Sequence, residues 1–286
     1  MSPRATTSVL FDVPGPRTRR RYRIYGVVAV VAFAALVTWA VLRLQDTGQF
    51  HGQKWKIFTY SQVRSSLYAG LRNTLKAFVL GATLALGFAV VFAAGRLSDH
   101  RVLRWPATFV IELFRAIPLV IMIFLVYYGF TDGKQKLWSL AIGLMLYNGS
   151  VLAEVLRAGI NAVPRGQAEA AFALGMRKSQ VMRSILLPQA VRTMLPSIVS
   201  QLVVLLKDTA LGFLILYDEL LDQGKDLFSA VEFERPVIPV SIVVAAVYIA
   251  MCSLLSLLAK FLERRLRRSP RAAAVVDPEQ AEILHG

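Results

Sequence analysis

The chain has 286 residues, of which 56% are hydrophobic, and a formal net charge of +15 at pH 7. Its mean hydropathy of +0.53 exceeds what one soluble core of this size absorbs, so the composition excludes an ordinary soluble protein and indicates a membrane protein. The chain has one cysteine, Cys252, and three scattered histidines, His51, His100 and His285. We therefore expect no intramolecular disulfide, no metal site and no catalytic residues.

The first apolar run extends from Tyr25 to Leu44 and carries no charge before Arg43. At roughly 20 residues it is long enough to cross the hydrocarbon layer of a bilayer as a helix. It is too long for a signal peptide, and no small-residue cleavage site with a polar start follows it. We expect a retained transmembrane helix.

Five further apolar runs follow, each close to the length of one membrane span. They are Leu75 to Ala94, Trp105 to Tyr128, Leu137 to Val155, Met194 to Leu216 and Val237 to Leu258. The sequence thus predicts an all-α polytopic membrane protein with about six transmembrane helices. Arg115 and Pro118 interrupt the second of these five runs, and Lys207 and Asp208 the fourth, so either run can be broken or partly re-entrant.

Lysine and arginine residues give the orientation, because short cytoplasmic loops retain them. With the N-terminus inside, the inner segments 1–24, 96–105, 157–192 and 260–286 carry 21 of these residues. The outer loops 45–68, 129–136 and 217–236 carry 7. We therefore expect both termini in the cytoplasm. Topology and contact with anionic membrane lipid explain the basic ends, so nucleic acid is not an expected partner.

The inner segment 157–192 is the longest cytoplasmic connection, and its apolar residues are spaced as in a short amphipathic helix. Gly175 permits a turn within it, while Pro164 and Pro188 mark its two ends. The residues alone predict a helix-turn-helix that lies flat on the inner face. It serves either as a cytoplasmic docking element or only as a connector.

Residues 169–188 of this segment read EAAFALGMRKSQVMRSILLP. This stretch resembles the EAA signature of ABC importer permeases, in which Glu-Ala-Ala is followed at fixed spacings by Gly, Ile and Leu-Pro. The resemblance implies a coupling helix that seats in a groove of a partner ATPase. The residues concerned are Glu169, Ala170, Ala171 and Gly175, with Pro188 in a structural role.

From about Leu67 to Leu266 the chain is similar to permeases of the polar amino-acid uptake family, for example at Gly70 to Leu75 and at Lys207 to Thr209. The resemblance implies a five-helix core of the type I importer fold (67–266), with its coupling loop near 160–190. The charge pattern, the first apolar run and the composition add a basic cytoplasmic N-terminus (1–24), an extra transmembrane helix with its outer loop (25–66) and a flexible cytoplasmic tail (267–286). The shortest family members lack the extra helix, its outer loop and the tail. The extra length resembles that of a permease of glutamate uptake systems.

The same resemblance implies an importer of several subunits in a bacterial plasma membrane. This chain would pair with an identical or similar permease above two ATP-binding subunits, and an extracytoplasmic solute-binding protein would deliver the amino acid. The sequence contains no G-x-x-x-x-G-K-[ST] phosphate loop. We therefore expect a transport subunit and not an enzyme, with no cofactor of its own, and with ATP and Mg²⁺ bound by the partner ATPase.

Charged groups within a span are costly unless they are paired or face water, which makes them candidates for the substrate path. Lys207, Asp208 and Thr209 indicate a helix break near the outer leaflet, where Lys207 attracts a carboxylate. Asp208 either pairs with Lys207 or meets the substrate ammonium, and a purely structural salt bridge is the alternative. Tyr147 and Asn148, in the preceding span, are further candidates to line the cavity.

The remaining polar residues have structural alternatives. Glu154 and Arg157 are three residues apart and are expected to pair, which would lock their helix to the inner loop. Arg115, just before Pro118, either anchors a kink through freed carbonyls or faces the path. The outer loop is acidic and either contacts the binding protein or is merely solvated. Its acidic residues are Asp218, Glu219, Asp222, Asp226, Glu232 and Glu234.

These patterns lead to one expected function, a permease subunit of an ATP-driven importer that moves a polar amino acid by alternating access. Glutamate is the first choice of substrate, and glutamine, arginine, histidine and cystine are the alternatives. A secondary transporter that is not driven by ATP is less well supported, because no inverted repeat is visible and the core has five helices.

Overall fold

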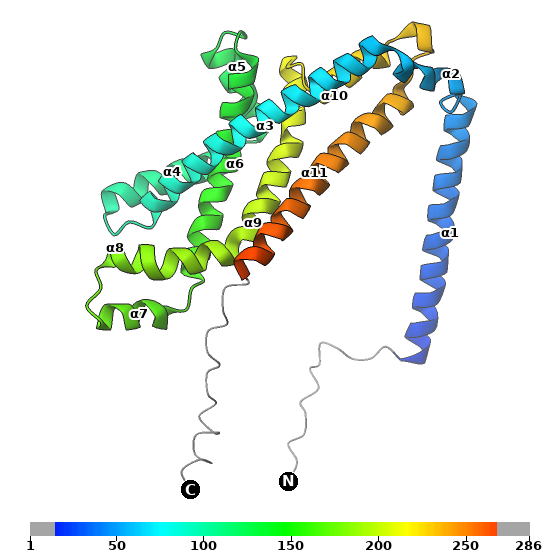
Figure 1. Cartoon of the computed structure of the whole chain (residues 1–286). Coiled ribbons are helices and arrows are strands. Elements are labelled where there is room, and N and C mark those ends of the chain that lie inside the picture. Colours follow the sequence, from blue (N-terminus) through cyan, green and yellow to red (C-terminus); the bar gives the residue numbers. More distant parts are fainter. Residues whose placement is uncertain (1–14, 268–286) are drawn as a thin grey trace.

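The structure is a computed structural model that describes residues 15–267, and these residues form helices joined by short turns (Figure 1). The all-α membrane class predicted from the sequence is confirmed. Residues 1–14, in the predicted cytoplasmic N-terminus, and 268–286, nearly all of the predicted tail, lie outside the described residues.

The helices follow one another with few residues between them. Their bounds are α1 Pro16–Asp46, α2 Gly52–Trp55, η2 Lys56–Thr59, α3 Ser61–Arg96, α4 Arg101–Ala116, α5 Leu119–Phe130, α6 Lys136–Asn161, α7 Arg165–Ala173, α8 Lys178–Gln180, η3 Val181–Leu186, α9 Leu187–Asp208, η4 Thr209–Ile215, α10 Leu220–Phe228, η5 Val231–Phe233 and α11 Val237–Arg267. Among the described residues, five helical segments are long and apolar enough to span a membrane, or six if α4 and α5 count as one broken span.

The predicted span Trp105 to Tyr128 is not one continuous helix. It is split into α4 and α5, whose axes differ by 101°. The break falls at Ile117, which has the extended backbone angles φ −86° and ψ 127°. Because the ring of Pro118 disfavours a helical conformation in the residue before it, the helix ends at Ala116 and a new one begins at Leu119.

The predicted span Met194 to Leu216 begins earlier than expected, since one helical segment runs from Lys178 to Ile215. The sequence predicted that Pro188 marks the end of the inner loop. In the structure Pro188 instead lies inside this helical segment. The residues before it form a π-helix, Val181–Leu186. Proline lacks an N–H and its ring crowds the carbonyl four residues earlier, and the wider π turn accommodates it without ending the helix.

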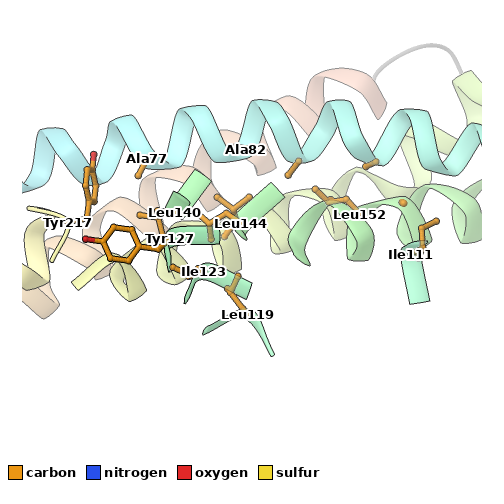
Figure 2. Close-up of a cluster of buried hydrophobic side chains, with 14 of the residues drawn as sticks. Ala77, Ala82, Ile111, Leu119, Ile123, Tyr127, Leu140, Leu144, Leu152 and Tyr217 are labelled. Carbon is orange, nitrogen blue, oxygen red and sulfur yellow. The ribbon is translucent and has the colours of Figure 1, made fainter. Parts of the chain in front are cut away.

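The core of the molecule is a seam between α3 and α6. Small residues of α3 repeat every fourth position along its buried face, namely Ala77, Gly81, Ala85, Ala89 and Ala93. Leu140, Leu144 and Leu152 of α6 pack against this face, and Ile123 and Tyr127 of α5 close the cluster (Figure 2). Since lipid gives apolar helices no hydrophobic drive to associate, small residues that let backbones approach closely hold such helices together.

The helix α1 has no buried residue and stands apart from the other helices in Figure 1. Its N-terminal end, α7 and α8, and the C-terminal end of α11 all lie on the same side of the molecule. This arrangement agrees with the predicted topology, in which both termini and the inner loop share the cytoplasmic side.

The α3–α6 seam gives a direct test through Gly149 of α6. A Cβ atom at this position would lie 3.2 Å from the backbone oxygen of Ala85 and 2.9 Å from the ring of Phe88. We expect Gly149→Val to lower the free energy of unfolding by about 1–3 kcal/mol, the usual cost of overpacking. The measurement is thermal unfolding in detergent micelles.

The control is Gly87→Val on α3, because a Cβ at Gly87 meets no atom within 4 Å. The two substitutions add the same atoms to membrane helices, so their difference isolates the close approach of the helices. Equal unfolding temperatures for the two variants would contradict the proposed packing.

Candidate functional site

The helix α7 of the inner loop ends in a Schellman motif. Met176 donates its N–H to the carbonyl of Ala171 at 3.2 Å, and Gly175 donates to the carbonyl of Phe172 at 2.9 Å. Gly175 has φ +77°, a left-handed conformation that glycine adopts without steric cost. The turn expected at Gly175 is therefore present, and it reverses the chain from α7 toward α8.

The residues of the EAA signature have different surroundings. Ala171 is buried, as is Val181 of η3, and α7 packs on η3. Glu169 and Ala170 are exposed. Phe172 and Leu174 are also exposed, by 48% and 83%. The loop thus presents large apolar side chains beside an acidic one, on a helix supported from behind, which is a surface suited to a partner protein.

At the inner end of α6, Glu154 and Arg157 form the pair that their spacing suggested. Arg157 Nε donates to both carboxylate oxygens of Glu154, at 3.1 and 3.0 Å. Arg115 lies in the last turn of α4 and pairs with Glu112, its Nη1 3.5 Å from that carboxylate. The structure therefore places Arg115 in an ion pair next to the break at Pro118.

In the middle of the molecule, Asn148 of α6 links two residues of α9. Its side-chain nitrogen donates to Asp208 Oδ2 at 3.2 Å, and its oxygen accepts from Gln201 Nε2 at 2.7 Å. Asn148 is fully buried. Gln201 was missed in the sequence, although it lies seven residues, or two helical turns, before Asp208 and so shares its helical face.

The sequence predicted a helix break at Lys207 and Asp208, but the helix continues there and only tightens from α9 into the 3₁₀ helix η4. The two residues face different surroundings. Lys207 lines an open cavity of about 400 Å³ between α9 and α11, together with Lys260 and Ser200. No ion pair joins Lys207 to Asp208 in the described part of the chain. The structure therefore does not contain the predicted alternative, a salt bridge between Lys207 and Asp208.

The path candidates Thr209 and Tyr147 both make contacts that stabilise the fold. Thr209 is fully buried, and its hydroxyl donates to the carbonyl of Leu206 at 2.6 Å. Tyr147 is half-buried and packs against the α3–α6 core. Thr209 therefore stabilises the turn at the end of α9, whereas Tyr147 borders the Asn148 network.

The outer loop is anchored to α3 by polar contacts. Asn73 donates to the carbonyl of Asp218 at 2.8 Å, and the hydroxyl of Thr74 accepts from the N–H of Leu220 at 3.1 Å. The hydroxyl of Tyr217 donates a hydrogen bond to the carbonyl of Asn73 at 3.1 Å. These contacts give Asn73 and Thr74, in the first half of α3, a structural role.

Glu219, assigned from the sequence to an acidic outer surface, is fully buried. It caps α10, accepting from the N–H groups of Leu221 and Asp222 at 2.8 Å, and it also accepts from the hydroxyl of Tyr248 at 2.6 Å. Asp222 is buried too. These two residues therefore offer no surface to a binding protein. The carboxylates left exposed in this loop are Asp218, Asp226, Glu232 and Glu234.

Residues 77–268 match the family described as binding-protein-dependent transport system inner membrane component. The chain is 40% identical over 248 residues to the glutamate transport system permease protein GluD of Corynebacterium glutamicum, covering 84% of this chain and 90% of that protein. It is 32% identical over 203 residues to the arginine transport system permease protein ArtQ of Bacillus subtilis, covering 69% and 91%.

Solved structures show the same fold. A crystal structure of an amino acid ABC transporter with histidines superposes with a TM-score of 0.67 at 29% identity, over 73% of this chain and 98% of that chain. A chain of the methionine ABC transporter MetNI superposes with a TM-score of 0.62 at 16% identity, over 72% and 99%. The second likeness, at so low an identity, concerns the fold alone.

The burial of Glu219 predicts a pH dependence of stability. Burial raises the pKa of this carboxyl from 4.5 to about 7, although Tyr248 and two N–H groups favour the charged form. Between about pH 4.5 and 7 the unfolded chain loses this proton and the native protein keeps it. Stability therefore falls as pH rises through this window, by at most about 3 kcal/mol, and levels off above it.

Glu219→Gln, measured by thermal unfolding in micelles from pH 4.5 to 8, should remove this component of the slope. Glu232→Gln is the matched control, because Glu232 is exposed in the same loop. Identical pH profiles for Glu219→Gln and the unaltered protein would refute the assignment.

Proposed function

Because the chain belongs to the binding-protein-dependent transport system inner membrane component family, we propose that it is the permease subunit through which an ATP-driven importer takes up glutamate. The chain is a multi-pass membrane protein and a permease subunit of an amino-acid ABC transporter. In such systems ATP is hydrolysed by a separate subunit, so this chain is not an enzyme. Glutamate is the part that is proposed.

The observation that carries the choice of glutamate is the extent of the match to GluD, whose name states glutamate transport. That match covers 84% of the chain at 40% identity. The permeases named for arginine and L-cystine transport match at 32% identity over 69% and 71% of the chain, and a putative glutamine permease at 33% over 69%. Glutamine, arginine, histidine and cystine remain the alternative substrates.

The local charge of the cavity between α9 and α11 is compatible with an anionic substrate. Lys207 and Lys260 line it together with one carboxylate, Glu263. Lys207 would attract a substrate carboxylate from this cavity. Asp208 lies outside the cavity, held by Asn148 of α6, and would accept from the substrate ammonium at another point of the path. The buried neighbour of Asp208 limits the reorganisation needed on binding.

The exposed surface around Glu169 supports the proposed contact with an ATPase, and the other subunits of the assembly are proposed from the family. Phe172 and Leu174 would enter a groove of an ATPase subunit, which would bind ATP and Mg²⁺, and the importer would contain two such subunits. A second permease, identical or similar, would complete the path, and a solute-binding protein would deliver the amino acid. The proposed cycle is alternating access, driven by closure of the ATPase pair.

The test of the proposed function is uptake by the complex reconstituted in liposomes with its ATPase and binding protein. We expect labelled glutamate to enter only when hydrolysable ATP is inside, and unlabelled glutamate to compete while glutamine, arginine, histidine and cystine do not. No uptake of labelled glutamate, or stronger competition by another of these amino acids than by glutamate itself, would overturn the substrate. Uptake without ATP would overturn the mechanism.

The proposed path residues are tested by Lys207→Ala and Asp208→Ala in the same assay. Hydrogen bonds to charged groups contribute about 1.5–3 kcal/mol, so we expect the apparent KM for glutamate to rise about tenfold or more in each. Lys134→Ala, in an exposed outer loop, is the control. An unchanged apparent KM and rate in both path variants would remove these residues from the path.

A further inference from the structure

The turn between α3 and α4, residues 96–101, is called here the α3–α4 corner. Its first residue, Arg96, ends α3 and bridges two other helices. Arg96 Nη1 lies 2.8 Å from Glu154 Oε2 on α6, and Nη2 lies 3.0 Å from Glu112 Oε1 on α4. The Arg96 side chain is only 17% exposed. One guanidinium therefore joins the inner end of α3 to α4 and to the inner part of α6.

The same corner has a second ion pair, and this one is exposed. Asp99 pairs with Lys178, the first residue of α8. The hydrogen bond and charge of Lys178 hold the pKa of Asp99 below its usual range. Both side chains are more than half exposed, so the pair contributes little to stability.

These two ion pairs connect the corner to both sides of the coupling loop, defined here as residues 162–177, which contains α7. Glu154 lies about two turns before Asn161, the last residue of α6. The coupling loop begins directly after Asn161. Lys178 follows the last residue of the loop. The corner is therefore linked to the chain on both sides of the loop, by a part-buried contact at Arg96 and an exposed one at Asp99.

Resting on the function proposed above, we propose that Arg96 is a positioning residue that carries the displacement of the coupling loop to α3 and α4. α3 forms the main seam of the core with α6, and it also reaches the outer loop through Asn73 and Thr74. A shift of its inner end therefore acts on elements at both faces of the membrane. Arg96 performs this role by bridging carboxylates on two different helices.

The geometry separates this role from a contribution to folding. When Arg96 is replaced, Glu154 keeps Arg157 and Glu112 keeps Arg115, each an ion pair within one helix. No carboxylate is left without a cationic neighbour, which is the situation that makes the loss of a buried ion pair strongly destabilising. Removing Arg96 therefore loosens the link between helices more than it unfolds any of them.

The experiment uses the complete importer in liposomes and measures labelled glutamate imported per ATP hydrolysed. We expect Arg96→Gln to lower this ratio about fivefold, within the range by which residues that link two sites alter their coupling, with an unchanged unfolding temperature. Arg96→Lys should give an intermediate ratio, because a single ammonium cannot reproduce the two-sided guanidinium fork. It also serves as the measured variant if Arg96→Gln fails to assemble.

Arg101→Gln is the matched control, since Arg101 is exposed in the same corner and makes no ion pair within the described residues. Asp99→Asn should lower the ratio less than Arg96→Gln does. The double variant Arg96→Gln with Glu154→Gln should lose no more than the larger single loss, because both changes break the same contact.

The outcomes distinguish this inference from the proposed function. Unaltered protein that imports no glutamate in an ATP-dependent way contradicts the proposed function. Unaltered protein that imports glutamate with ATP, combined with an unchanged ratio in Arg96→Gln and Arg96→Lys, contradicts the role of Arg96. A ratio that falls equally in Arg101→Gln also contradicts it, because the effect would then follow from charge at the corner and not from the bridge.

Discussion

The close packing of α3 on α6 is the constraint on which the rest of the structure depends. Apolar helices in lipid gain little from contact unless small residues let their backbones approach, and the repeat of alanine and glycine from Ala77 to Ala93 provides this. The register of this seam sets where α6 directs its polar residues. Asn148 then meets Asp208 and Gln201 on α9, and Glu154 meets Arg96 at the inner end.

One helix break and one change of helix type lie next to charged residues. The break at Pro118 turns α5 away from α4 by 101°, next to the Arg115 pair with Glu112. After Asp208 the helix continues but tightens from α9 into the 3₁₀ helix η4, beside the cavity lined by Lys207. Irregular backbone is costly in lipid, so it persists where protein or a water-filled cavity satisfies its hydrogen-bonding groups. The break and the change of helix type thus each lie beside charged residues, although other charges, such as Lys76 of α3 and Glu154 of α6, lie within continuous helices.

The inner loop and the outer loop are both held rigidly, though by different means. Backbone hydrogen bonds around Gly175 and the burial of Ala171 support the inner loop, whereas Glu219 and Thr74 tie the outer loop to neighbouring helices. Rigid ends allow a movement at one face to reach the other as a displacement of whole helices. This is the mechanical property that an importer driven from one side requires.

The sequence by itself determined the membrane class, most span positions, the turn at Gly175 and the Glu154–Arg157 pair. These features depend on composition or on residues within one or two helical turns of each other, so local rules reach them. Only the tertiary structure decided that Arg96 meets Glu154, that Gln201 joins Asn148, that Glu219 is buried and that Lys207 and Asp208 diverge. The physical reason is that each of these outcomes depends on neighbours far apart in the chain, whose positions follow from how the α3–α6 seam orients whole elements.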